Sequence, residues 1–221
     1  MKKTERVVGA LFLLSTCSFL IGSGMLDPIL HRTDLLVHME SDRINVMAGL
    51  FLELINAVAV VGIAMLLQPT IKKYHEAFAF GYFASRVMES ALLMISLIGP
   101  LILLALSKQS ISAGTSGDSY LQTLGSLAVE AHYLLFDIAM LVLSLGSLLF
   151  CYILYRSGLV PRWLSIIGLI GYTGLLASSS LSVAGLDIGE VLYIPGAIFE
   201  IVLPVWLIVR GFNRHTQASI K

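Results

Sequence analysis

Residues 46–67 read VMAGLFLELINAVAVVGIAMLL, an apolar run interrupted by only two strongly polar side chains, Glu53 and Asn56. A helix needs about 20 mostly apolar residues to cross a bilayer, and this stretch has that length. Its apolar residues are contiguous, whereas a strand of a membrane barrel would alternate them with polar residues. The stretch therefore predicts a transmembrane α-helix.

Five further runs share this character, which predicts an all-α fold, a bundle of six transmembrane helices. We expect a single transmembrane domain over residues 1–221, with spans at about 7–26, 46–67, 77–106, 127–155, 163–184 and 191–209. The third and fourth spans are longer than a bilayer requires, so they must tilt, kink or protrude. Residues 114–118 form a loop between them, and Gly158 is expected to cap the fourth helix just before Pro161 starts the fifth.

The bulk composition agrees with a membrane protein. Hydrophobic residues make up 57% of the chain and charged residues 13%, whereas a soluble domain has about 25% charged residues. The formal net charge is +0, and without a basic arm no nucleic-acid partner is expected. Cys17 and Cys151 lie in apolar runs, so they do not form a disulfide framework or a metal motif. The partner expected from composition is therefore the lipid bilayer.

Basic residues predict the orientation. With six spans, one side of the membrane carries Lys2, Lys3, Arg6, Lys72, Lys73, Arg156, Arg162, Arg210, Arg214 and Lys221, and the other only Arg32, Arg43 and Lys108. The positive-inside rule then places both termini in the cytoplasm. The first span also resembles a signal peptide that ends in a lipoprotein box at Cys17. Cleavage or lipidation there is left open, although the apolar run continues to Leu26 and favours an uncleaved helix.

Three stretches carry a family resemblance: Arg86-Val87-Met88-Glu89-Ser90-Ala91, residues 156–164 and residues 199–211. Together they resemble a bacterial multi-pass membrane family catalogued as a domain of unknown function, family 4386. The resemblance covers nearly the whole chain and implies six spans in the bacterial plasma membrane. It implies no activity, cofactor or catalytic residue.

Ionisable and amide side chains inside the spans are the strongest functional signal. A charge at the bilayer centre costs roughly 2.5–3.5 kcal/mol on insertion scales, so such residues face the bundle interior and mark functional sites. The candidates for a ligand or ion site are Arg86, Glu89, Glu53, Asn56, Glu200 and Asp137. At 1.5 Å per residue, four of the charged ones lie roughly 13–21 Å from the cytoplasmic ends and could meet in one layer, with Asp137 further out.

Arg86 is expected to organise this layer. Arg86 and Glu89 have i,i+3 spacing, which places them on one face of a helix, and a guanidinium suits one carboxylate. The surplus acids must then be protonated, hydrated or bound to a cation. The alternative is an ion-paired strut that fixes the register of the helices.

Two prolines within the predicted spans interrupt helix hydrogen bonds. Pro204 removes the hydrogen bond to the carbonyl of Glu200, and Pro100 removes the bond to the carbonyl of Ser96. Broken helices of this kind recur at transporter binding sites. They are also tolerated in ordinary bundles, where neighbouring groups satisfy the freed carbonyl.

Three classes of function remain. The first is binding or transport of a small molecule or cation by the intramembrane cluster. The second is a non-catalytic accessory or regulatory subunit with structural ion pairs. The third is an intramembrane enzyme that uses Glu130, His132 and Asp137. No cofactor, metal or catalytic motif is recognised, which disfavours the third class. A homo-oligomer is left open, since six helices are few for a transporter acting alone.

Overall fold

Every element of the described chain is helical. The computed structural model describes residues 2–32, 34–113, 119–186 and 190–213, and no strand occurs among them. The predicted loop at 114–118 lies outside the described residues, as do Arg214 and Lys221. The elements are α1 (Lys2–Leu30), α2 (Leu35–His38), α3 (Arg43–Ile71), α4 (Glu76–Ser96), α5 (Ile98–Ala113), α6 (Ser119–Ser157), α7 (Arg162–Val183), the 3-10 helix η1 (Glu190–Tyr193) and α8 (Ile194–Val209).

Six helical segments are long and apolar enough to cross a membrane. They are Lys3–Leu30, Arg43–Ile71, Glu76–Ile111, Ser119–Ser157, Arg162–Val183 and Val191–Val209. The third comprises α4 and α5, and the sixth includes the last turn of η1. The predicted all-α bundle of six transmembrane helices is confirmed, and the protein is a multi-pass membrane protein.

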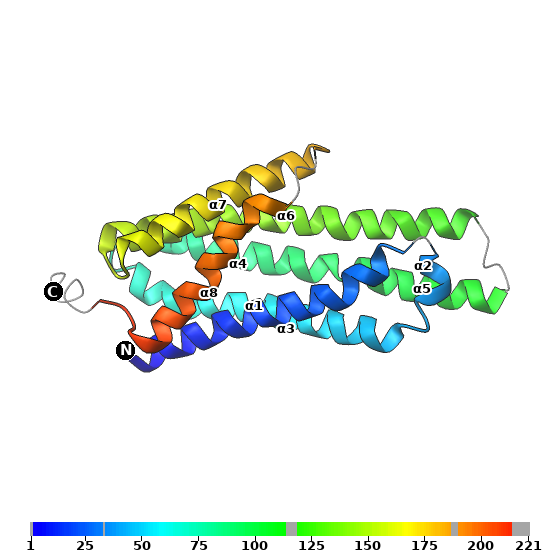
Figure 1. Cartoon of the computed structure of the whole chain (residues 1–221), viewed down its shortest axis with the longest axis horizontal. Coiled ribbons are helices and arrows are strands. Elements are labelled where there is room, and N and C mark those ends of the chain that lie inside the picture. The colour runs from blue at the N-terminus through cyan, green and yellow to red at the C-terminus, as the bar shows by residue number, and fades with distance from the viewer. Residues whose placement is uncertain (1, 33, 114–118, 187–189, 214–221) are drawn as a thin grey trace.

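The six segments pack as a ring that follows the order of the chain (Figure 1). α1 packs on α3, α3 on α4, α4 on α6, α6 on α7 and α7 on α8, and α8 returns to α1. The start of α1 and the end of α8 lie at the same end of the bundle, beside the α3–α4 and α6–α7 connections (Figure 1). We call this the basic end because it carries Lys3, Arg6, Lys72, Arg162 and Arg210. The other end is called the opposite end.

The third and fourth segments are much longer than a bilayer is thick. α6 has 39 residues, about 58 Å at 1.5 Å per residue, whereas the hydrocarbon core measures about 30 Å. The third segment bends at Leu97, between α4 and α5. Figure 1 shows that α5 and the first part of α6 continue well past the end of α7. The excess length is therefore taken up by a kink in the third segment and by an extension of both toward the opposite end.

The bend is fixed by a contact with α6. Pro100 cannot donate to the carbonyl of Ser96, and His132 Nδ1 lies 2.8 Å from that oxygen and donates to it instead. His132 is buried. A Cβ on Gly99 would lie 2.6 Å from the carbonyl oxygen of Ala128, so α5 touches the backbone of α6 beside the bend. The neighbouring helix thus satisfies the freed carbonyl.

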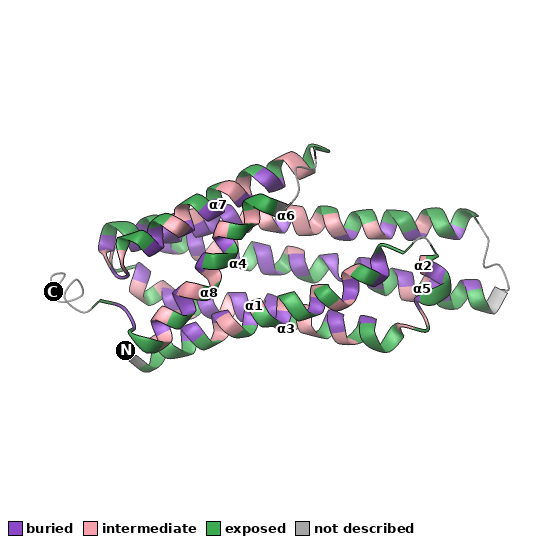
Figure 2. Cartoon of the chain, viewed as in Figure 1, coloured by how far each residue is buried: buried purple, intermediate pink, exposed green. Residues whose placement is uncertain are grey.

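Apolar side chains fill the ring toward its basic end. Buried residues face the interior of the ring and exposed ones cover its outside (Figure 2). Leu67, Leu159, Val160 and Phe212 are at most 5% exposed, and the backbone N–H of Asn213 donates to the carbonyl of Leu159 at 2.8 Å. The α6–α7 connection and the segment after α8 therefore close this end of the bundle.

Glycines set the closest helix contacts. A Cβ on Gly171 of α7 would collide with the backbone nitrogen of Gly196 in α8. A Cβ on Gly9 of α1 would lie 2.7 Å from the carbonyl oxygen of Pro204. Small residues allow such backbone approach in membrane bundles. Gly158 has φ 64° and follows the end of α6, which confirms the predicted helix cap.

Candidate functional site

Arg86 and Glu89 form a buried ion pair within α4. Their side chains are 4% and 3% exposed, and Arg86 Nη1 lies 2.7 Å from Glu89 Oε2 and 2.9 Å from Oε1. The guanidinium also lies 5.6 Å from the ring centroid of Tyr82. One nitrogen of Arg86 makes both hydrogen bonds, and its Nε is buried with no partner in the part of the chain that the structure describes. The predicted shared face is present, but the guanidinium is only partly engaged.

The pair borders a cavity of about 80 Å³ at the centre of the ring. Its polar lining consists of Ser15, Thr16, Asn56, Arg86, Glu89 and Glu200. These side chains come from α1, α3, α4 and α8, and α6 contributes apolar side chains. A water molecule takes up about 30 Å³ in the liquid, so the space suits a few waters, an ion or a ligand of few heavy atoms.

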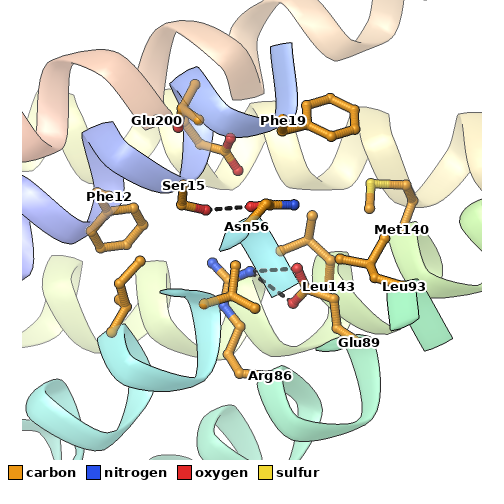
Figure 3. A pocket seen from close by; sticks show the side chains of 13 residues that line it. Phe12, Ser15, Phe19, Asn56, Arg86, Glu89, Leu93, Met140, Leu143 and Glu200 are labelled. Carbon is orange, nitrogen blue, oxygen red and sulfur yellow. Dashed lines mark hydrogen bonds and ion pairs between the residues drawn. The ribbon is translucent and has the colours of Figure 1, made fainter. Parts of the chain in front are cut away.

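Two hydrogen bonds between helices frame the cavity. Ser15 Oγ of α1 donates to Asn56 Oδ1 of α3 at 2.5 Å. Tyr172 Oη of α7 donates to Glu200 Oε1 of α8 at 3.0 Å. Figure 3 shows the carboxylate of Glu200 on one side of the Ser15–Asn56 bond and the Arg86–Glu89 pair on the other. Four of the six predicted site residues thus face one space.

Glu53 lies outside this lining. Glu53 is one helical turn from Asn56 along α3, on the side of the bundle's opposite end. It packs against Gly22 of α1, where an added Cβ would lie 3.0 Å from the Glu53 Cγ. The side chain packs against α1 at Gly22 and does not line the cavity, so the layer expected from depth alone does not include Glu53.

Asp137 and the residues of the predicted enzyme site have separate surroundings. Asp137 Oδ2 accepts from Ser182 Oγ of α7 at 2.6 Å, Glu130 is exposed, and His132 donates to Ser96. Asp137 and His132 bond to different helices and Glu130 is exposed, so the three side chains do not form one site. Among the described residues, no group of three or more His, Cys, Asp or Glu side chains is placed to hold a metal ion.

Several polar residues around the cavity were not predicted. Ser15, Thr16 and Tyr172 carry hydroxyl groups that are common in membrane helices, so residue type alone gave no signal. A weak signal was available in the spacing of Ser15, Ser23 and Asp27. Multiples of four residues separate them, which places them on one face of α1. At the opposite end of that stripe, Ser23 Oγ and Tyr133 Oη both donate to the Asp27 carboxylate, at 2.5 and 3.0 Å.

The charges around the cavity do not balance. Arg86 and Glu89 compensate each other. In the described part of the chain Glu200 forms no ion pair, and it accepts a hydrogen bond from the neutral hydroxyl of Tyr172. When ionised, Glu200 is therefore a carboxylate of the lining without a cationic partner among the described residues.

Comparison with known proteins defines a family and not an activity. No curated protein and no solved structure matches the chain. The family model described as domain of unknown function DUF4386 matches residues 7–211, which confirms the resemblance carried by the Arg86–Ala91 stretch and its two companions. The chain is therefore a member of the DUF4386 family.

Proposed function

We propose that the protein binds a small molecule or ion in its central cavity, with Arg86, Glu89, Asn56 and Glu200 facing the ligand. The observation that carries this proposal is an unfilled space bordered by charged side chains in the middle of a membrane bundle. Protein interiors are close-packed, and ionisable residues inside a membrane usually mark a ligand or ion pathway. A space kept open beside three charged groups fits a binding site.

The alternative of a structural strut is less well supported. A strut that fixes helix register must link two helices, whereas Arg86 and Glu89 both belong to α4. The hydrogen bonds between helices at this level come from the neutral donors Ser15, Ser90 and Tyr172. The ion pair is therefore not needed to join the helices, and a purely accessory subunit explains its presence poorly.

Transport extends the binding proposal. Toward the basic end the cavity is followed by buried apolar side chains, and toward the opposite end Phe19, which lines it, stacks on Phe136 at 5.7 Å between ring centroids. Packed side chains toward both ends of a central site fit alternating access. Pro204 lies one turn from Glu200 within α8, a helix interruption of the kind found beside transporter sites.

The binding proposal is tested by filling the cavity. Thr16→Phe in the lining should abolish any ligand-induced rise in the thermal unfolding midpoint, measured on the purified full chain against a panel of small anions, cations and zwitterions. Leu20→Phe is the matched control, since Leu20 lies one turn along α1 and is 59% exposed. The proposal fails if no compound stabilises the wild type more than the Thr16→Phe variant.

The bacterial plasma membrane is the proposed location, with the basic end in the cytoplasm. Lys and Arg concentrate at this end, and the positive-inside rule assigns it to the cytoplasm. In a variant without native cysteines, Lys73→Cys should react only with reagents applied to the cytoplasmic side and Ser116→Cys only from outside. Reaction of both positions from one side would contradict the proposed topology.

A further inference from the structure

We propose that the ligand of the central cavity is a small organic cation, of the methylated ammonium class, with the Glu200 carboxylate as its counter-ion. This inference rests on the proposed function and adds the chemical class of the ligand. The charges, the surfaces and the approach to the cavity support it.

The charge of the lining selects against anions. An anion would have to approach Arg86, whose charge Glu89 already compensates at 2.7 Å, and would enter a space that Glu200 also borders. A cation would instead complete the pairing of Glu200, which has a hydroxyl group but no basic side chain as its partner among the described residues. Adding one positive charge brings the site to neutrality, and a buried charge needs such compensation.

The surfaces of the cavity favour an organic cation over a metal ion. Hard metal ions take at least six oxygen ligands. Here both oxygens of Glu89 already accept hydrogen bonds from Arg86. The remaining wall is apolar and includes the aromatic rings of Phe12 and Phe19 beside aliphatic side chains and Met140. Aromatic faces attract alkylammonium groups, whose charge is spread over C–H groups that also pack on apolar surface.

The approach from the opposite end is also suited to a cation. Glu53 of α3 packs on Gly22 of α1, and Asp27 follows further along α1, so both lie past Phe19 toward the opposite end. Tyr133, one turn from Phe136 in α6, bonds to Asp27. Neighbouring carboxylates raise the local concentration of cations. Phe19, the lining residue of α1 nearest to these carboxylates along the helix, stacks on Phe136 of α6.

The experiment compares ligand classes on the full chain in lipid nanodiscs. Tetramethylammonium and methylammonium chloride are tested against sodium and potassium chloride, and sodium acetate and phosphate are the anion probes, at matched ionic strength. At about 100 times its dissociation constant, an alkylammonium ion should raise the unfolding midpoint by about 5–10 °C. Sodium, potassium, acetate and phosphate should not.

Variants test whether the alkylammonium shift of the unfolding midpoint depends on the cavity. Glu200→Gln keeps an acceptor for Tyr172 and should lose the alkylammonium shift, whereas Glu130→Gln, at an exposed carboxylate of α6, should keep it. Phe19→Leu should retain binding with about 3- to 30-fold weaker affinity. Loss of the shift in Glu130→Gln as well would overturn the assignment to Glu200.

The outcomes separate the two proposals. If acetate or phosphate stabilises the wild type but not the Thr16→Phe variant, the cavity binds a ligand and the cation class is wrong. The cation class is also wrong if sodium or potassium matches the alkylammonium ions, or if Glu200→Gln keeps the full alkylammonium shift. If no probe or panel compound stabilises the protein through the cavity, a proton on Glu200 satisfies the charge, and both proposals fail.

Discussion

Replacing Arg86 by methionine should destabilise the protein strongly, because it leaves the carboxylate of Glu89 without its counter-ion. The Glu89 side chain is 3% exposed, so bulk solvent does not reach the carboxylate, and the few waters that fit in the cavity replace the guanidinium only in part. Removing one member of a truly buried pair costs about 3–5 kcal/mol. Replacing both members, as Arg86→Met with Glu89→Leu, should restore most of that loss, since an apolar pair of similar volume is often as stable as the ion pair.

The matched control is the Lys72–Glu76 pair, which has the same 2.7 Å separation but is 52% and 75% exposed. Lys72→Met should therefore have no measurable effect, because exposed pairs contribute little. Unfolding free energies can be measured in mixed micelles with increasing dodecyl sulfate, followed by tryptophan fluorescence. If Arg86→Met costs no more than Lys72→Met, the pair is well hydrated and its burial does not make Glu89 depend on Arg86.

Two further substitutions, His132→Leu and Gly171→Ala, test helix contacts away from the ion pair, and Gly24→Ala is the control for the second. His132→Leu leaves the carbonyl of Ser96 without its donor, so we expect a loss of about 1–3 kcal/mol in the same unfolding assay; an unchanged free energy would show that water replaces the imidazole. Gly171→Ala places a methyl group against the backbone of Gly196 and should cost about 1–3 kcal/mol. Gly24→Ala, where a Cβ meets nothing within 4 Å, should be neutral or slightly stabilising in that assay, and equal effects of the two alanines would contradict the assigned contact.

The architecture could be predicted from the sequence because it depends on length and hydropathy. A bilayer of fixed thickness demands about 20 apolar residues per crossing, and residues 46–67 satisfy this without any knowledge of neighbours. The fate of the extra length in the third and fourth segments could not be predicted. It depends on whether α6 offers a donor to the carbonyl freed by Pro100, and His132 does so from a distant part of the chain.

For the candidate site, the sequence could predict only the depth of each residue along the membrane normal. Counting residues gives depth, and depth correctly grouped Arg86, Glu89 and Glu200. It could not give the direction in which a side chain leaves its helix, which depends on the contacts between helices. Glu53 therefore does not join the group, because it packs against α1 at Gly22 and does not line the cavity. Asn56, one turn along the same helix, faces the cavity and bonds to Ser15.

Glu200 is held in place by the same contacts that close the ring. Gly196, Glu200 and Pro204 follow at four-residue intervals and so share one face of α8. Gly196 meets the backbone of α7 at Gly171, and the carbonyl of Pro204 meets α1 at Gly9. The carboxylate thus lies between two close backbone approaches, one turn away on either side. A side chain fixed in this way is preorganised for a ligand. An added methyl group at Gly171 should therefore weaken ligand binding as well as packing, by moving Glu200 relative to the Arg86–Glu89 pair.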